Sequence, residues 1–251
     1  LPDTPESREE LAQYAMSLER ADSGLARLIE ILRETGHWDD TLIVFLSDNG
    51  IAFPGAKTNL YEPGVNLPFV IRNPHGLTGG HVRNAIVAYT YVAPTRLDHA
   101  GVAYEPKDFH GRSLLRITRG EPAADRDEVF LSHTFHEITM YYPVRVVRDR
   151  QYKLIWNIAH GLPFPFASDL YNSTTWQGVL DRGDERYGLR TVDALIHRPA
   201  FELYDLKADP GETRNLANDE AHAAILHAFQ TRLRNHQERT GDPWNLKRDR
   251  D

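Results

Sequence analysis

Residues 41–68 read TLIVFLSDNGIAFPGAKTNLYEPGVNLP, and this stretch indicates how the chain folds. Residues 41–46 are rich in β-branched and apolar side chains, which is typical of a short buried strand. The strand runs directly into Ser47-Asp48-Asn49-Gly50, so a carboxylate and an amide follow its carboxyl end. In open α/β sheets, ligands bind at that edge. The stretch therefore predicts an α/β fold with a ligand site just after residue 46.

The residues after the strand are suited to a hard cation and an anionic ligand. Asp48 and Asn49 supply oxygen atoms of the kind that Ca²⁺ prefers, and Gly50 lets the backbone turn sharply beneath them. Nine residues after Asp48, Lys57 can place an ammonium against an anionic substrate group. Asp-Asn-Gly is also an ordinary turn signal and Lys57 an ordinary loop lysine, and spacing alone leaves that alternative open.

The same stretch resembles the second half of the sulfatase signature, in which S-D-N-G is followed by G-K, Y-E-G-G and V-P. Within that family the chain most resembles the sulfamidases, the heparan N-sulfatases. The matching residues are 48–51, 53–54, 58–61, 63–64, 136–140, 142–143, 145 and 163–165. The resemblance covers nearly the whole chain. It implies part of an alkaline-phosphatase-like sulfatase sandwich with a small C-terminal antiparallel sheet plus helix.

The resemblance also implies a reaction. In sulfatases a cysteine or serine in a C/S-x-P-x-R phrase becomes formylglycine, whose hydrate attacks sulfur while Ca²⁺ and basic residues hold the sulfate. By this match Asp48 and Asn49 ligate Ca²⁺, and Lys57 contacts the sulfate or the leaving group. Sulfamidases carry arginine at the Lys57 position and lack the acid at Glu62, whereas this chain keeps lysine and glutamate. Specificity for N-sulfate or O-sulfate therefore stays open.

The sequence lacks the first half of the sulfatase pattern. It has no cysteine, no S-x-P-x-R phrase and no paired aspartates ahead of its first predicted helix. We therefore expect a C-terminal half that is inert alone, whose partners are a missing N-terminal half and a sulfated sugar or glycosaminoglycan fragment. The expected formylglycine and export signal would lie in that missing half, and the whole protein would be periplasmic, secreted or lysosome-like. A homodimer is an open alternative.

Composition narrows the classes of partner. A net charge of −7 and a pI near 5.9 argue against a nucleic-acid binder, and no apolar run approaches the length of a membrane span. Without cysteines, neither a disulfide nor a thiolate zinc site can form. For a polyanionic substrate we expect a local basic patch, formed by Lys57, Arg72, Arg145 and Arg148.

The pattern turns to strands past Gly120 and Pro122, which predicts two domains. The resemblance implies that residues 1–120 are the C-terminal part of the catalytic α/β domain and that residues 121–251 are a C-terminal subdomain. In the first, we expect a helix that ends at Gly36 and whose apolar stripe lies on the sheet. Thr4 is its N-cap candidate, and residues 7–10 offer a capping box one turn later as an alternative. A second buried strand follows at residues 69–72, and a short helix at 92–101 exposes Arg96. In the second we expect strands at 128–133, 144–148, 152–158 and 201–206, a hairpin turn at 149–151, and a helix over 219–240. Residues 174–199 show little periodicity and are expected to form an irregular excursion.

A second candidate group follows the predicted strand at 128–133. His133, His136 and Glu137 are expected in one loop, where they could bind the hydroxyls or the amine of a sugar. A surface loop without such a role is an equal alternative. Two further functions stay open for the chain: an inert sulfated-glycan-binding module, and a phosphatase-like member of the same superfold, although Asn49 stands where that site wants histidine.

Overall fold

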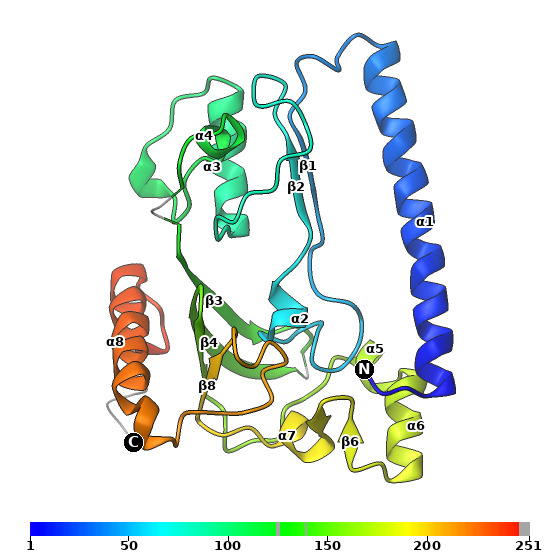
Figure 1. The fold of residues 1–251 in the computed structure, drawn as a ribbon, viewed down its shortest axis with the longest axis vertical. Coiled ribbons are helices and arrows are strands. Elements are labelled where there is room, and N and C mark those ends of the chain that lie inside the picture. The colour runs from blue at the N-terminus through cyan, green and yellow to red at the C-terminus, as the bar shows by residue number, and fades with distance from the viewer. Residues whose placement is uncertain (124–125, 139, 246–251) are drawn as a thin grey trace. The chain divides into compact units, whose positions relative to one another are not determined.

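The computed structural model describes residues 1–123, 126–138 and 140–245 (Figure 1). The chain forms two compact units. The sheet unit comprises Leu1–Ser7, Asn49–Leu67 and Glu128–Asp251, and the helical unit comprises Arg8–Asp48 and Pro68–Asp127. Compact units need not coincide with domains, so the boundary at residue 120 stays a prediction.

The first helix, α1, spans Pro5–Glu34 and begins where the sequence predicts. The Thr4 hydroxyl accepts a hydrogen bond from the Ser7 amide at 3.3 Å, and the Ser7 hydroxyl accepts one from the Thr4 amide at 3.1 Å. This reciprocal cap satisfies two backbone donors. After the last turn, Gly36 adopts a left-handed φ of 76° and ends the helix as predicted.

The apolar stripe of α1 is not buried, so the prediction that it lies on the sheet was wrong. Leu11, Tyr14, Leu18 and Leu28 expose 37–60% of their surface. The two strands of the helical unit are each only four residues long and are themselves partly exposed, so they offer little apolar area for a helix of eight turns.

Those two strands, β1 (Ile43–Leu46) and β2 (Phe69–Arg72), pair antiparallel, with Ile43 opposite Arg72 and Leu46 opposite Phe69. Both strands were predicted, but their burial was not correct, since Phe45 is 42% and Val70 60% exposed. A two-stranded ribbon cannot bury both of its faces without covering layers.

The remainder of the helical unit packs short helices around a small core. They are the 3-10 helices η1 (Tyr89–Tyr91) and η2 (Pro106–Asp108) and the helices α3 (Val92–His99) and α4 (Leu115–Thr118). The buried Thr95 hydroxyl of α3 accepts a hydrogen bond at 2.8 Å from the amide of Leu114, just before α4. Arg96 is exposed, as predicted.

The sheet unit is built on four antiparallel strands in the order β3-β4-β5-β8. They span Glu128–Phe135, Tyr141–Asp149, Tyr152–Asn157 and Phe201–Asp205. All four were predicted, as was the tight hairpin between β4 and β5, in which Arg148 pairs with Lys153.

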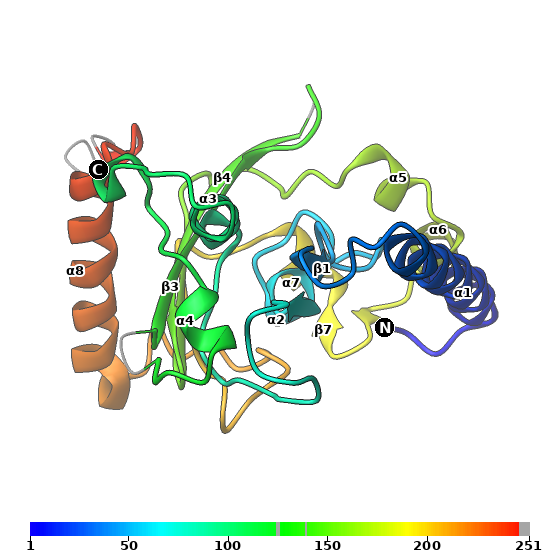
Figure 2. The same ribbon diagram turned by 90° about the horizontal axis from the view of Figure 1, so that it is seen from above.

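One face of this sheet packs against α8, which spans Ala223–Thr240 after the 3-10 turn η3 (Glu220–His222). Val147, Leu154 and Leu203 from the strands meet Phe229 and Leu233 from the helix. Figure 2 shows the sheet on edge, with α8 along this face and α2 and α7 on the other side. The predicted terminal helix and its apolar side are confirmed.

The opposite face of the sheet carries both apolar and charged side chains. Val144, Val146 and Ile155 form a core there with Tyr61 and Phe164. Tyr61 belongs to the segment Asn49–Leu67, called here the Lys57 segment, which includes the short helix α2 (Glu62–Val65). The segment that follows the sequence motif is therefore docked on the C-terminal sheet.

The prediction that residues 174–199 form an irregular excursion was wrong, because residues 168–196 are largely regular. They form α5 (Ser168–Tyr171), α6 (Thr174–Arg182), the two-residue strands β6 (Arg186–Tyr187) and β7 (Arg190–Thr191), and α7 (Val192–Ile196). Trp176, Val179, Tyr187 and Leu195 make a separate buried cluster. None of the helices in the described part of the chain combines the length and apolar composition that crossing a membrane requires.

Candidate functional site

The Lys57 segment folds back tightly on itself. A Cβ atom on Gly50 would lie 2.3 Å from the Pro63 carbonyl oxygen, and one on Gly64 would lie 2.2 Å from the Asn59 carbonyl oxygen. Only glycine permits approaches this close. Phe53 is 3% exposed and anchors the loop. The turn that the sequence placed after Asp48 therefore also brings the two ends of the loop together.

The backbone of Lys57 is held in place by its neighbours. Its carbonyl oxygen accepts hydrogen bonds from the Thr58 hydroxyl at 2.7 Å and from the side-chain Nδ2 of Asn59 at 2.9 Å. Thr58 has a φ of 62°, which is unfavourable for a β-branched residue and is found where surrounding contacts enforce it. Arg198, which is buried, donates to the Asn59 side chain at 2.5 Å and connects the loop to the rest of the sheet unit.

The ammonium of Lys57 reaches a carboxylate on α5. Its Nζ atom lies 2.5 Å from Asp169 Oδ2, and the two side chains are 18% and 46% exposed. Burial by itself raises the pKa of Asp169, but the hydrogen bond and charge of Lys57 outweigh it and hold that pKa below 3.8. The predicted catalytic cation is therefore a largely buried ammonium held by an ion pair.

Asp48 and Asn49 follow β1, as the sequence predicted. Asp48 is exposed, and its charge adds to the effect of burial in raising the pKa of Tyr89. The Asn49 side chain donates to the Gly50 carbonyl at 2.8 Å, which fixes the orientation of its amide. Within residues 1–123, 126–138 and 140–245, no three histidine, cysteine, aspartate or glutamate side chains form a metal-binding group.

These two residues nevertheless fit Ca²⁺ in their chemistry. Both offer hard oxygen ligands, and Ca²⁺ takes about six to eight of them, often with waters among the set. Asp48 and Asn49 would supply two ligands, so further oxygens must complete the site. The metal-binding role of the pair remains a prediction.

The second candidate group is divided between a strand and a turn. His133 lies within β3 opposite Val144, not in a loop, which corrects the sequence prediction of its place. The strand runs on to Phe135 because residues 128–135 continue to pair with β4. His136 and Glu137 lie in the turn that follows, and Thr139 of the family pattern lies outside the described residues.

His133 is a half-buried histidine. Its Nδ1 lies 3.2 Å from the Tyr142 carbonyl oxygen and donates to it, while its buried Nε2 has no hydrogen-bond partner among the described residues. Burial lowers the pKa of His133 below 6.5, although the bond to Tyr142 opposes the shift. The imidazole is therefore a neutral group whose Nε2 can accept a hydrogen bond.

Glu137 contacts the same short helix as Lys57. Its Oε1 atom accepts hydrogen bonds from the Ser168 amide at 3.0 Å and the Ser168 hydroxyl at 2.9 Å. The next residue, Asp169, pairs with Lys57. The structure thus joins two sequence-predicted site residues through α5, a helix that the sequence did not predict.

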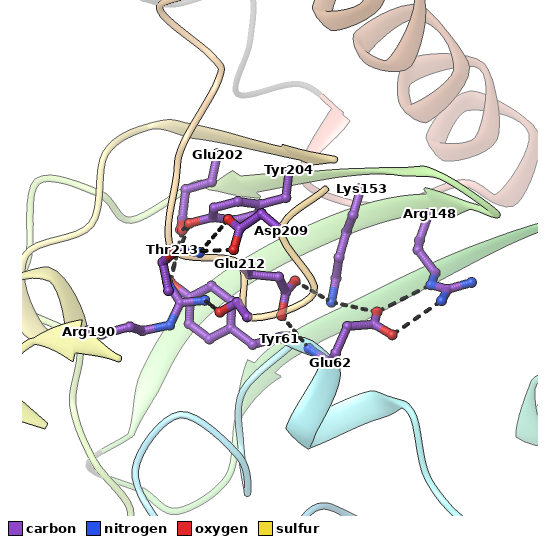
Figure 3. A network of polar contacts seen from close by, with 11 residues as sticks. Tyr61, Glu62, Arg148, Lys153, Arg190, Glu202, Tyr204, Asp209, Glu212 and Thr213 are labelled. Carbon is purple, nitrogen blue, oxygen red and sulfur yellow. Dashed lines mark hydrogen bonds and ion pairs between the residues drawn. The ribbon is translucent and has the colours of Figure 1, made fainter. Parts of the chain in front are cut away.

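A buried group of ion pairs anchors the other end of the Lys57 segment (Figure 3). Arg148 makes a two-point contact with Glu62, each bond 3.2 Å long. Lys153, which is fully buried, lies 3.2 Å from Glu62 Oε1 and 2.8 Å from Glu212 Oε1. Glu212 Oε2 also accepts the backbone amide of Glu62 at 2.6 Å, at the start of α2.

The two carboxylates of this group differ in pKa. Burial raises the pKa of Glu212, more than the nearby Lys153 lowers it. For Glu62, burial by itself also raises the pKa, but Lys153 and Arg148 together hold it below 4.5. The negative charge of Glu62 is therefore better compensated by neighbouring cations than that of Glu212.

A neighbouring network fixes Tyr61. The carboxylate of Glu202 accepts hydrogen bonds from Tyr61 at 2.9 Å, from Tyr204 at 2.5 Å and from Asn157 at 2.6 Å. The guanidinium of Arg190 stacks 3.7 Å from the centre of the Tyr61 ring. Figure 3 shows Glu202, Tyr204 and Arg190 gathered around Tyr61. The segment after Lys57 is thus held by buried polar contacts as well as apolar ones.

The expected open basic patch of Lys57, Arg72, Arg145 and Arg148 does not form as predicted. Arg145 is 6% exposed and makes a two-point contact with Asp242, and Arg148 is taken up by Glu62. In the helical unit, Arg72 stacks on a tryptophan ring and donates to backbone carbonyls. Desolvated cations require partners, and this acidic chain supplies carboxylates for them.

Known proteins resemble this chain in sequence and in fold. A sulfatase family model matches residues 2–102, and a model described as N-sulphoglucosamine sulphohydrolase, C-terminal, matches residues 56–161. N-sulphoglucosamine sulphohydrolase from Homo sapiens is 38% identical over 97% of this chain. The chain belongs to the sulfatase family. It spans about half the length of this human sulfatase, 51%.

Solved structures extend the comparison to the fold. A protein in complex with its substrate D-glucosamine-2-N,6-O-disulfate superposes with a TM-score of 0.64 at 26% identity, over 88% of this chain and 39% of that one. The phosphonate monoester hydrolase of Agrobacterium radiobacter superposes with a TM-score of 0.58 at 22% identity, over 84% of this chain and 38% of that one, and shows the fold alone. The predicted α/β, alkaline-phosphatase-like sulfatase fold is confirmed.

Proposed function

We propose that this chain provides the calcium-binding and sulfate-contacting part of a sulfatase that hydrolyses sulfate esters or sulfamates, with N-sulfoglucosamine of heparan-type glycans as the substrate. The observation that carries the proposal is the Lys57 segment, with Asp48-Asn49 at its start and a positioned Lys57 ammonium, in a chain 38% identical to human N-sulphoglucosamine sulphohydrolase. The whole protein would act in a periplasmic, secreted or lysosome-like compartment.

Each residue has a separate role in this proposal. Asp48 and Asn49 hold Ca²⁺, which when bound supplies positive charge to the sulfate oxygens. Lys57 contacts the sulfate or the leaving group, and the ammonium has three donors, of which Asp169 takes one. His136, which is exposed in the turn after β3, contacts the sugar, whereas the buried Nε2 of His133 has no surface to offer it.

The nucleophile of the reaction is proposed to come from outside these 251 residues. A formylglycine needs a cysteine or serine in a C/S-x-P-x-R phrase, and this sequence holds neither a cysteine nor that phrase. In the complete enzyme such a group would supply the nucleophile that attacks sulfur, and the role of Lys57 would be to offset the negative charge that develops on the sulfate or the leaving group. The chain alone is therefore expected to release no sulfate from N-sulfoglucosamine.

The test is a fusion protein. The half of human N-sulphoglucosamine sulphohydrolase that this chain does not match is placed ahead of it, and sulfate release from N-sulfoglucosamine is measured with Ca²⁺ present. We expect turnover, and a loss of about 10²–10³-fold in kcat for Lys57→Ala, the usual cost of removing one charge-stabilising donor. Lys57→Arg should retain activity, and Lys107→Ala, an exposed lysine, should have none of this effect.

Three results would contradict parts of the proposal. Turnover at enzymatic rates by the chain alone would show that the nucleophile lies within it. Strictly calcium-dependent binding of N-sulfoglucosamine without turnover, in the fusion and in the chain, would instead support a sulfated-glycan-binding module. Unchanged calcium affinity and activity in Asp48→Ala would show that the loop after β1 is only a turn, without a metal-binding role.

A further inference from the structure

We infer that Glu137 and Asp169 are positioning residues that act on Lys57 through α5. The inference deepens the proposed function, on which it rests for the role of Lys57. It changes the interpretation of Glu137, which the sequence placed among the residues that touch the sugar. Three observations support this inference. They are the hydrogen bonds between Glu137 and Ser168, the contacts that hold the short helix α5, and the ion pair between Asp169 and Lys57.

The first contact is a cap supplied from a distance. The residue before α5, Ala167, has no side chain that could satisfy the first amides of the helix. Glu137 does so from 31 positions earlier in the chain, with Oε1 accepting both the amide and the hydroxyl of Ser168. A carboxylate is a favourable group at the start of a helix.

The second step is the dependence of α5 on such contacts. A helix of four residues has no stability of its own, because it barely completes the costly first turn. The fully buried Leu170 fixes one side of it in the core, and the Asn172 side chain donates to the Ser168 carbonyl at 2.8 Å. The Glu137 cap is what sets the orientation of its first turn.

The third observation is the ion pair with Asp169, through which the orientation of α5 fixes the position of the Lys57 ammonium. Asp169 Oδ1 accepts the amide of Leu170 at 3.0 Å, which turns Oδ2 toward Lys57 Nζ at 2.5 Å. An unpaired lysine side chain samples many rotamers, and a fixed carboxylate selects one of them. Lys57 is therefore positioned by a helix whose own geometry depends on Glu137.

This arrangement predicts how substitutions at Glu137 behave. The cap requires an acceptor atom and not a charge, so Glu137→Gln should preserve it and Glu137→Ala should abolish it. A residue that bound a sugar amine through its charge would lose function in both variants. Comparison of these two variants therefore separates positioning from direct recognition.

The experiment reads Lys57 itself. The chain has five lysines, so with ¹⁵N-lysine labelling the Nζ signals can be assigned by single substitutions. In the wild-type chain the hydrogen bond to Asp169 should slow the exchange of the Lys57 ammonium protons with water. We expect exchange to become about tenfold faster in Asp169→Asn and in Glu137→Ala, and to remain near wild type in Glu137→Gln.

Two comparisons complete the test. Glu238→Ala, at an exposed position on α8, should leave the Lys57 signal unchanged. The signal of the buried Lys153 reports whether a variant is folded. An unchanged exchange rate of the Lys57 ammonium in Glu137→Ala would overturn the inference. Exchange that is accelerated equally in Glu137→Gln and Glu137→Ala would also overturn it.

The same variants in the fusion protein connect the inference to function. The kcat for N-sulfoglucosamine should fall in Glu137→Ala, as it does in Lys57→Ala, and be restored in Glu137→Gln. If the wild-type fusion neither binds nor cleaves N-sulfoglucosamine, the proposed function fails, whereas the exchange data still decide whether Glu137 positions Lys57. The two failures are therefore distinguishable.

Discussion

Replacing Lys153 by methionine tests how the Lys57 segment is anchored. The side chain has no exposed surface, and its Nζ lies 2.8 Å from Glu212 Oε1 and 3.2 Å from Glu62 Oε1. Methionine keeps most of the volume but leaves the Glu212 carboxylate buried without its cation. Removing one partner of a buried ion pair costs about 3–5 kcal/mol. At about 2–4 °C per kcal/mol for a chain of this size, Tm should fall by about 6–20 °C.

Urea unfolding followed by tryptophan fluorescence measures this loss. Three of the four tryptophans, Trp156, Trp176 and Trp244, lie in the sheet unit, so the signal reports mainly on the part that Lys153 stabilises. Lys207→Met is the matched control, because Lys207 is exposed in the loop after β8. The control should unfold within about 0.5 kcal/mol of wild type.

The loss should depend on pH with a definite sign. The pKa of Glu212 is already raised by burial, and removing Lys153 raises it further. Between 4.5 and that raised value the folded variant holds a proton that the unfolded chain releases, so the stability of the variant falls as pH rises. The difference from wild type should therefore be larger at about pH 8 than at about pH 5. A difference below about 1 kcal/mol, or one that is equal at both pH values, would refute the anchoring role.

Three further predictions follow from single contacts. The pKa of His133 is below 6.5 in the folded chain, so wild type should lose stability as pH falls through 6.5, and His133→Gln should narrow the gap in Tm between about pH 7.5 and pH 5.5. A gap in Tm of equal size in wild type and in His133→Gln would contradict this prediction. Gly64→Ala places Cβ 2.2 Å from the Asn59 carbonyl oxygen and should cost about 3 kcal/mol in urea unfolding, whereas Gly161→Ala, in open space, should be tolerated. Although burial by itself raises the pKa of Asp242, its arginine partner holds it below 3.8, so this contribution is lost as pH falls through the folded pKa. Asp242→Asn should therefore reduce the difference in urea midpoint between about pH 5 and pH 3, and an unchanged difference would contradict the pairing.

Local patterns predicted the regular elements that carry their own signals. The cap at Thr4, the left-handed Gly36 and the short turn between β4 and β5 are all contained within a few residues, so the sequence shows them directly. Even α6 had such signals, since Ser173 caps it and Gly183 ends it at a φ of 65°. A helix only nine residues long completes fewer than three turns, which is too short to establish an apolar period.

The partners of the candidate site residues were beyond the sequence for a different reason. Asp169 lies 112 positions from Lys57, and Glu212 lies 150 positions from Glu62. No local period or spacing connects such pairs. The family resemblance pointed to Lys57, but it gave no partner for it. The prediction that β1 and β2 are buried was wrong for another reason. An apolar sequence shows what a strand could bury, but not whether a covering layer is present.

The long separations in the Lys57 segment also constrain the order of folding. Glu62 meets Lys153 across 91 positions, Tyr61 meets Glu202 across 141, and the amide of Glu62 meets Glu212 across 150. Contacts this remote in sequence form slowly, because the chain must close a large loop before they contribute stability. During synthesis the Lys57 segment emerges well before the strands that hold it. The residues proposed to contact sulfate therefore reach their final geometry only after the last strand of the sheet is in place.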